Sequence, residues 1–377
     1  MMMYDILVIG GGVIGCSIAY HLAKKGHRIA IVERGELGQE ASSAAGGMLG
    51  SQNEFDEEHP LFPLAQKSRQ MYPNLQAELK ELTGIDIELV QEGLLKMASS
   101  SKDLEAIHRQ YQFLSSRNPH ITWCERDDLL QMETNLSEEV EAGIYIPEDG
   151  QVSAPKLSKA LATACKKMSV SIYERTEAID MIIQNEKVVG VKTNHHELFG
   201  HQTIIASGAW SNQLLKKTGR SIPMIPVKGE CYSVICDQPL IRKTLFNVNG
   251  CYIVPKSENR LLIGATSTPH CDQHHVSVAG LHSLIIQATA MLPKIKESTF
   301  ERAWAGIRPQ TGDGMPYMGE HPELENLYIC TGHYRNGILL TPITGKLFSD
   351  YITGNREASE RLKPFSLDRS FVGGEIN

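Results

Sequence analysis

The chain has 377 residues, of which 41% are hydrophobic and 21% are charged, and its formal net charge is −7. This length suggests roughly two domains with cores large enough to form without disulfides or metals. The mildly acidic balance excludes a general attraction for nucleic acid or anionic membranes. The eight cysteines include no C-x-x-C pair, which is typical of free thiols in a reducing compartment.

The first residues lead directly into a predicted strand. Residues 1–3 leave no room for a signal peptide before it. No apolar run reaches the roughly 18 residues of a membrane span. We therefore expect a cytoplasmic protein with no membrane span.

The N-terminal region predicts a strand, a helix and a second strand. Residues 4–10 are apolar and β-branched, residues 16–26 have apolar positions at helical spacing, and residues 27–33 form another apolar run. This order is a βαβ unit, the context that a glycine-rich phosphate-binding turn requires.

The turn of this unit has the pattern G-x-G-x-x-G. Gly10 permits a tight turn, Gly12 lets the backbone approach a pyrophosphate, and Gly15 lets the helix pack on the strand. The helix N-terminus faces the phosphate charge. Glu33, at the end of the second strand, would accept ribose hydroxyls and repel a 2′-phosphate. A glycine-rich turn without a ligand is the less favoured alternative.

Residues 36–50 favour FAD over a nicotinamide cofactor. Ser42 and Ser43 can donate hydroxyls to phosphate, and residues 44–47 are small enough to lie against a flat ring. A nicotinamide enzyme normally continues to another βαβ repeat instead. The alternative for this segment is a flexible surface linker.

Two later segments support the same cofactor. Residues 201–211 predict a strand that ends in a small-residue turn, and residues 325–354 predict a strand, a glycine turn and a helix. The N-terminus of that helix, near Gly337 and Ile338, would stabilise negative charge on a reduced flavin. An ordinary βα corner is the alternative for the second segment.

Several long motifs identify a family. They are SSAAGGMLG (42–50), PVKGE (226–230), CYIVP (251–255), LLIGAT (261–266), WAGIRPQTGDGMPYMG (304–319) and GHYRNGILL (332–340). Through them the chain resembles, over nearly its whole length, the D-amino-acid oxidase superfamily of FAD-dependent oxidoreductases, and within it the glycine oxidase branch of the thiamine pathway.

The resemblance implies an α/β fold (α+β overall) with two domains. A doubly wound, Rossmann-like FAD-binding domain would carry an inserted antiparallel-sheet substrate domain. We expect the FAD-binding domain at 1–84, 143–223 and 304–365, and the substrate domain at 85–142 and 224–303. Residues 366–377 would form a loosely held tail.

Two arginines and one tyrosine are candidates for the chemistry. Arginine binds a carboxylate through two charge-assisted hydrogen bonds, although most arginines are surface or structural residues. The resemblance implies that Arg308 is the main clamp for the substrate carboxylate. Tyr252 would support it, and Arg335 would contribute nearby. Gly250 stands where the glycine oxidase pattern has a histidine, which leaves the substrate size open.

The resemblance also implies the cofactor contacts. The expected residues are Gly10, Gly12, Val13, Ile14, Gly15, Glu33, Arg34, Ser42, Ser43, Ala45, Gly46, Gly47, Met48, Ala178, Ser207, Gly208, Trp210, His333, Arg335, Asn336, Gly337, Ile338 and Leu339. Cys330 precedes the last of these segments, and some relatives attach flavin through cysteine. The glycine oxidase branch does not, so we expect noncovalent FAD.

The implied reaction is oxidation of glycine, sarcosine or D-alanine by hydride transfer from Cα to flavin N5. It gives an imine, and dioxygen is reduced to hydrogen peroxide. The glycine imine or its hydrolysis product glyoxylate would feed thiazole synthesis, and the assembly would be a homotetramer. Two alternatives remain, a D-amino-acid dehydrogenase that passes electrons to a quinone or carrier, and a non-catalytic flavoprotein.

Two further patterns are set aside. PHCDQHH (269–275) collects histidines, a cysteine and an aspartate, but it lacks zinc-ligand spacing, and we expect no metal site. EFDEEHP (54–60) is an acidic run that we interpret as a solvated loop or helix start, and the resemblance places it near the mouth of the active site.

Overall fold

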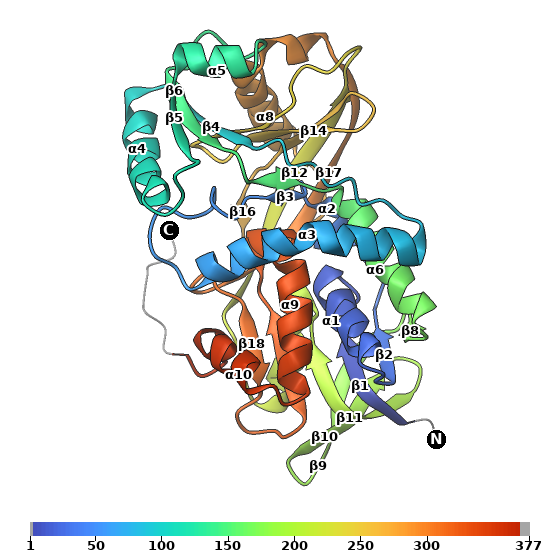
Figure 1. The fold of residues 1–377 in the computed structure, drawn as a ribbon. Helices are drawn as coiled ribbons and strands as arrows, with labels where there is room; N and C mark the ends of the chain where they lie inside the picture. Colours follow the sequence, from blue (N-terminus) through green and yellow to red (C-terminus); the bar gives the residue numbers. More distant parts are fainter. Residues whose placement is uncertain (1–2, 370–377) are drawn as a thin grey trace.

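The computed structural model describes residues 3–369, which form two units, each built on one large β-sheet (Figure 1). One sheet has eight strands and the other has nine among these residues. A two-stranded pairing of β3 (Met48–Leu49) with β7 (Gly150–Gln151) lies between segments of the two units. The α/β fold class predicted from the sequence is confirmed.

The eight-stranded sheet is mainly parallel and follows the predicted βαβ order. Strand β1 pairs in parallel with β2 on one side and with β11 on the other. The sheet order is β18-β19-β11-β1-β2-β8, and β9 and β10 add an antiparallel ribbon to β11. The strands are β1 (Met3–Ile9), β2 (Ile29–Val32), β8 (Ser171–Tyr173), β9 (Ala178–Gln184), β10 (Lys187–Thr193), β11 (Glu197–Ile205), β18 (Tyr317–Glu320) and β19 (Leu327–Thr331).

A layer of helices covers one face of this sheet. The helices α1, α3, α6 and α9 pack against one another in this layer (Figure 1). Their apolar faces and the β1 and β2 side chains Ile6, Val8 and Ile31 form one buried cluster. The helices of the molecule are α1 (Val13–Lys24), α2 (Ala41–Ala44), α3 (Leu61–Thr83), α4 (Ser101–Ser115), α5 (Arg126–Met132), α6 (Ala154–Lys167), α7 (Ser211–Leu215), α8 (Val278–Met291), α9 (Gly337–Ile352) and α10 (Arg356–Leu362).

The nine-stranded sheet is mainly antiparallel. Its order is β16-β12-β15-β14-β13-β4-β6-β5, with β17 on the other side of β12. Successive residues alternate between two buried clusters, as a strand requires: Ile253 packs with α8, and its neighbour Tyr252 packs on the opposite face. The strands are β4 (Leu94–Ala98), β5 (Thr122–Glu125), β6 (Ala142–Ile146), β12 (Met224–Ile235), β13 (Thr244–Asn247), β14 (Tyr252–Lys256), β15 (Arg260–Gly264), β16 (Thr268–Pro269) and β17 (Thr299–Thr311).

The domain boundaries expected from the sequence remain a prediction. Two of them, at 143 and 304, fall inside β6 and β17, both of which belong to the nine-stranded sheet. In the described part of the chain, no helix combines the length and apolar character that a membrane crossing needs.

The expectation of a loosely held tail is wrong for residues 366–369. Leu367 is buried, and Arg369 makes two hydrogen bonds to the Asp313 carboxylate, at 2.7 and 2.8 Å. Both side chains of this pair are at most 10% exposed, and the guanidinium stacks 3.7 Å above the Tyr317 ring. Because an isolated charge is costly to bury, each partner depends on the other. Residues 370–377 of the predicted tail lie outside the described residues.

Replacing this arginine tests how firmly the segment is held. Arg369→Ala leaves the Asp313 carboxylate buried without its partner, so we expect a loss of about 3–5 kcal/mol in the free energy of unfolding. Lys363→Ala removes an exposed cation paired with Glu360 and should cost less than about 1 kcal/mol. Thermal and urea denaturation of the two variants measures the difference. Equal stabilities would contradict the account.

Candidate active site

A cavity of about 580 Å³ is lined by residues from both units. It extends from the ends of β1 and β2 to β12, β14 and β17. All of the predicted site residues line it except Gly15 and Ser43. The fold therefore brings together segments that lie more than three hundred positions apart, such as the turns at Gly12 and Gly337.

The glycine-rich turn has the close contacts that its pattern predicts. Gly10 has a φ of 110°, and a Cβ there would lie 2.5 Å from the carbonyl oxygen of Ala206. A Cβ on Gly15 would lie 2.0 Å from the carbonyl oxygen of Gly10, so Gly15 acts through helix packing and not from the cavity wall. Ser43 also lies outside the wall, because its hydroxyl donates to the carbonyl of Gln39 at 2.9 Å.

Two helix N-termini face the cavity. Helix α1 begins after Gly12, which has no side chain to cap it, and Val13 N–H donates to the Ser42 hydroxyl at 3.0 Å. Helix α9 begins at Gly337, and its N-cap Asn336 makes no side-chain capping bond. The first N–H groups of a helix have no partner within the helix, and the helix dipole adds partial positive charge there. Both ends of the cavity can therefore hold negatively charged or carbonyl groups.

The predicted ribose acid is held rigidly at the end of β2. Glu33 is 9% exposed, and its two carboxylate oxygens accept from Gly11 N–H at 2.7 Å and Gly35 N–H at 2.8 Å. Each oxygen keeps a further lone pair for a hydroxyl donor. The neighbouring Arg34 stacks 3.7 Å above the Trp210 ring, which forms a flat wall beside it.

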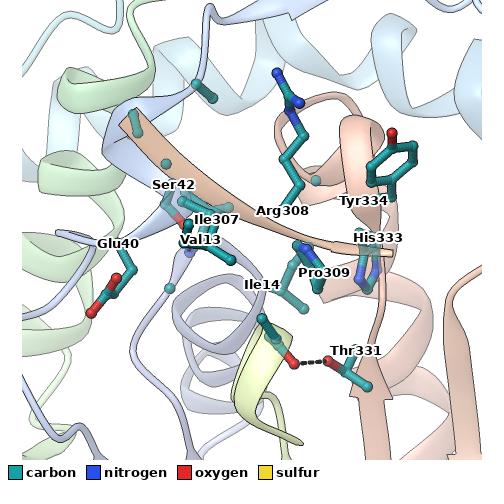
Figure 2. A pocket seen from close by; sticks show the side chains of 18 of the residues that line it. Val13, Ile14, Glu40, Ser42, Ile307, Arg308, Pro309, Thr331, His333 and Tyr334 are labelled. Atoms are coloured by element: carbon teal, nitrogen blue, oxygen red, sulfur yellow. Dashed lines mark hydrogen bonds between the residues drawn. The ribbon is translucent and has the colours of Figure 1, made fainter. Parts of the chain in front are cut away.

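Arg308 rises from β17 into the cavity and forms no ion pair among residues 3–369 (Figure 2). Its Nη1 donates to the carbonyl of Thr266 at 3.2 Å. A Cβ on Gly229 would lie 2.2 Å from Nη2, so the glycine on the facing strand β12 leaves the space that the guanidinium occupies. Arg308 thus presents an uncompensated positive charge to the cavity.

Tyr252 stands beside the same space. Its hydroxyl lies 3.6 Å from the Cys231 sulfur, and its ring fits where a Cβ on Gly46 or Gly264 would collide with it. Burial raises the pKa of Tyr252 well above its usual value, so the phenol stays protonated and can donate a hydrogen bond. The charges of Arg308 and Arg335 both act on this hydroxyl.

A buried network fixes the carbonyl to which Arg308 donates. The Thr266 hydroxyl donates to Glu230 Oε2 at 3.0 Å and accepts from Glu230 N–H at 2.9 Å. Glu230 is 2% exposed, and its other oxygen accepts from Lys228 Nζ at 2.9 Å and from Ser277 N–H at 2.7 Å. Within the PVKGE motif, Gly229 lines the cavity, and the Lys228–Glu230 ion pair behind the wall holds the loop that supports the guanidinium.

Arg335, the second predicted arginine, is paired. Its Nε lies 3.3 Å from Oε2 of Glu54, and its Nη2 donates to Oε1 at 3.4 Å. The Glu54 carboxylate raises the pKa of Arg335 further. Glu54 belongs to the acidic run that the sequence placed near the active-site mouth, but its side chain is only 18% exposed. For this residue the expectation of a solvated loop is wrong.

Two other side chains on the wall remain uncharged. Burial lowers the pKa of His333 to about 3, so its imidazole is neutral, with Nε2 lying 3.2 Å from the Thr344 hydroxyl. Burial raises the pKa of the Cys330 thiol well above its usual value. A protonated thiol is a poor nucleophile, which favours a cofactor held without a covalent bond.

The histidine-rich segment 269–275 gathers no metal-binding cluster. Within residues 3–369 no three histidine, cysteine, aspartate or glutamate side chains come together as ligands. His274 lies 3.4 Å from the Glu40 carboxylate instead.

The family model described as FAD dependent oxidoreductase, abbreviated DAO, matches residues 5–351. The chain belongs to this family. It is 47% identical to the glycine oxidase of Geobacillus kaustophilus over 97% of both chains, and 37% identical to that of Bacillus subtilis over 97% of both. The bifunctional protein ThiO/ThiG of Trichormus variabilis is 32% identical, over 98% of this chain and 55% of that protein.

Solved structures agree with this assignment. The crystal structure of glycine oxidase from Geobacillus kaustophilus superimposes with a TM-score of 0.93 at 45% identity, over 98% of this chain and all of that chain. The L-proline dehydrogenase of P. horikoshii gives a TM-score of 0.85 at 22% identity, which shows the shared fold alone. The chain is an FAD-dependent oxidoreductase of the glycine oxidase kind.

The cavity wall fits FAD. The uncapped start of α1 and the close backbone at Gly10 suit a pyrophosphate, and Glu33 suits a ribose. At the other end, a Cβ on Gly46 would collide with Tyr252 and one on Gly47 would lie 2.0 Å from the Val152 carbonyl. The small residues predicted to lie against a flat ring are therefore required by packing, and this segment is not a flexible linker.

Several wall residues were missed by the sequence reasoning. They are Glu40, Glu54, Lys217, Cys231, Asn249, Thr266 and Ser267, among others. Cys231 directly follows the PVKGE motif, and Thr266 is the last residue of the LLIGAT motif. Both motifs carried the family resemblance, so these two residues could have been predicted from their position. For Glu54 the family resemblance placed the acidic run 54–60 near the active-site mouth, but an acidic run is usually a solvated surface, so its side chain was not predicted to face the cavity.

Gly229→Ala tests how the clamp is positioned. The new methyl group would occupy the place of the Arg308 guanidinium, whose flexible end can shift at little cost in stability. We expect the KM for the amino-acid substrate to rise about tenfold to hundredfold, because small misplacements of a positioning group are costly. Gly319→Ala, where a Cβ meets ordinary contacts, is the matched control. Unchanged kinetics in Gly229→Ala would argue against this position for Arg308.

Proposed function

We propose that the chain is an FAD-dependent glycine oxidase that also accepts other small amines, such as sarcosine and D-alanine. The observation that carries the proposal is the pair of Arg308 and Tyr252 on the cavity wall. They offer an uncompensated cation and a protonated phenol beside the wall that fits a flavin. The glycine oxidases among its relatives, which match over nearly the whole chain, support the same substrate.

The chain's own residues would orient the substrate. Arg308 would bind the carboxylate, Tyr252 would donate a hydrogen bond to it, and the fixed carboxylate would leave Cα facing the flavin. The bound flavin would accept a hydride from Cα at N5 and pass the electrons to dioxygen, giving hydrogen peroxide. His333 is neutral and buried, so it would not compete for the substrate carboxylate as a second cation.

No protein base is required when the substrate reacts as the free amine. Loss of the Cα hydride leaves an iminium ion, because the nitrogen lone pair supplies the electrons of the new C=N bond, and loss of a nitrogen proton to solvent gives the imine. Water then converts the glycine imine to glyoxylate and ammonia. We propose that this imine or glyoxylate feeds the thiazole ring of thiamine, in line with the family resemblance.

The proposal includes the substrate and cofactor contacts predicted from the sequence. The cofactor would be noncovalent FAD, and residues 1–84, 143–223 and 304–365 would form the FAD-binding domain. The eight-stranded sheet and the helix layer α1, α3, α6 and α9 support that division. The other two segments would form most of the substrate domain.

We propose a cytoplasmic homotetramer. Helix α8 contains no charged residue, and Val278, Ile285 and Ile286 on it are exposed, as is Phe300 nearby. Exposed apolar patches of this kind are typical of interfaces between subunits. Light scattering of the purified holoenzyme should give about four times the 41.8 kDa mass of the chain. A monomer at working concentration would refute the assembly.

Arg308→Ala tests the substrate assignment. Removing the charge partner of a bound carboxylate costs 2–5 kcal/mol, so kcat/KM for glycine should fall by about 30-fold to several thousandfold. FAD content should stay unchanged, because Arg308 acts on the substrate. Peroxide formation and flavin absorbance measure the two quantities. Arg109→Ala, which removes an exposed arginine of α4, is the control. Unchanged turnover in Arg308→Ala would sink the assignment.

A further inference from the structure

The substrate end of the cavity has two cations and one anion. Arg308 forms no ion pair within the described residues, and Arg335 is held by Glu54 through two contacts, at 3.3 and 3.4 Å. The other charged residues of the wall, Glu33, Arg34, Glu40, Glu177 and Lys217, come from the segments next to β2, α2 and β9. The charge left for a substrate is therefore one positive charge, which matches one carboxylate.

Glu54 is fixed in this position by its neighbours. The buried carboxylate of Asp149 accepts from Asn53 N–H at 3.0 Å and from the Ser51 hydroxyl at 3.1 Å. Gln110 donates to the carbonyls of Asn53 and Phe55, at 2.8 and 2.9 Å. The backbone on both sides of Glu54 is thus anchored, which keeps its side chain within reach of Arg335.

Lys96 is the other cation whose charge interacts with Glu54. Both residues line a smaller cavity of about 240 Å³ together with Asp56; burial lowers the pKa of Lys96, and the Glu54 and Asp56 carboxylates partly offset this effect. Lys96 forms no ion pair within residues 3–369, and its Nζ lies 5.7 Å from the centre of the Phe246 ring. Arg335 is therefore the direct ionic partner of Glu54 in the described chain.

We propose that Glu54 is a specificity-determining residue that restricts the site to amines with a single acid group. By occupying Arg335, it leaves Arg308 as the cation without an ion pair at the substrate end of the described wall. A second carboxylate on the substrate would meet the Glu54 carboxylate, and like charges facing each other in a cavity are unfavourable. The inference rests on the proposed oxidase function and specifies its substrate class.

Removing the charge of Glu54 should open the site to diacids. Sarcosine and iminodiacetate differ by one carboxylate on the nitrogen substituent, so they form a matched pair of substrates. In Glu54→Gln, the ratio of kcat/KM for iminodiacetate to that for sarcosine should rise about tenfold, mainly through KM. Glu57→Gln makes the same charge change on an exposed neighbour that does not line the cavity, and it should leave the ratio unchanged.

Measuring the binding of acids that cannot be oxidised tests the role of Glu54 without requiring turnover. Glutarate and butanoate have the chain lengths of iminodiacetate and sarcosine but no amine, so they bind without being oxidised. Their dissociation constants follow from the shift in the absorbance of the bound flavin. Glu54→Gln should favour glutarate over butanoate about tenfold relative to wild type. If wild type binds these acids but oxidises no amine, the proposed function is contradicted. The dissociation constants would still show whether Glu54 discriminates against a second carboxylate.

The double variant Glu54→Gln/Arg335→Gln identifies the cause. If the gain comes from releasing Arg335, it should disappear in the double variant. A gain that persists in part would come from the lost repulsion between Glu54 and the second carboxylate, whereas an unchanged glutarate preference in Glu54→Gln would overturn the proposal. Should Glu54→Gln fail to retain FAD, Glu54→Ala takes its place in the same comparison.

Discussion

The pairing of β12 with β17 is the interaction on which the site depends. These two antiparallel strands run in register from Met224 opposite Thr311 to Ile235 opposite Thr299, with one irregularity near Ser233. One strand carries Arg308, and the other carries the glycine that makes room for it and the buried Lys228–Glu230 pair behind it. A shift of one residue would turn these side chains to the opposite face, so strand register fixes the chemistry of the cavity.

Close packing explains why so many wall residues are small. Gly10, Gly46 and Gly229 each leave a space that a Cβ would close against a neighbouring backbone, tyrosine or arginine. The small residues near α2 and the uncapped starts of α1 and α9 then present backbone groups to the cavity. The part of the wall that fits FAD is therefore built largely from backbone groups and small residues, whereas the proposed substrate end has two arginines, one tyrosine and one glutamate.

The sequence predicted the features that depend on local pattern. The strand, glycine turn and helix at residues 4–26 have fixed spacing, and the structure has β1 and α1 there. The family resemblance carried by the longer motifs predicted that Arg308 and Tyr252 lie at the substrate site, and both line the cavity. Ser43, next to Ser42 on a helical turn, lies outside the cavity wall, and its role as a cofactor contact stays a prediction. Glu54 and the anchored residues 366–369 depend on contacts between distant segments, for which the chain has no local pattern.

The most direct test of the account is anaerobic mixing of the yellow holoenzyme with glycine, followed by air. The account predicts that glycine bleaches the flavin absorbance and that air restores it with formation of hydrogen peroxide. Absorbance that air does not restore would indicate a dehydrogenase that needs another electron acceptor. If glycine, sarcosine and D-alanine all leave the absorbance unchanged, the proposed substrate class is contradicted.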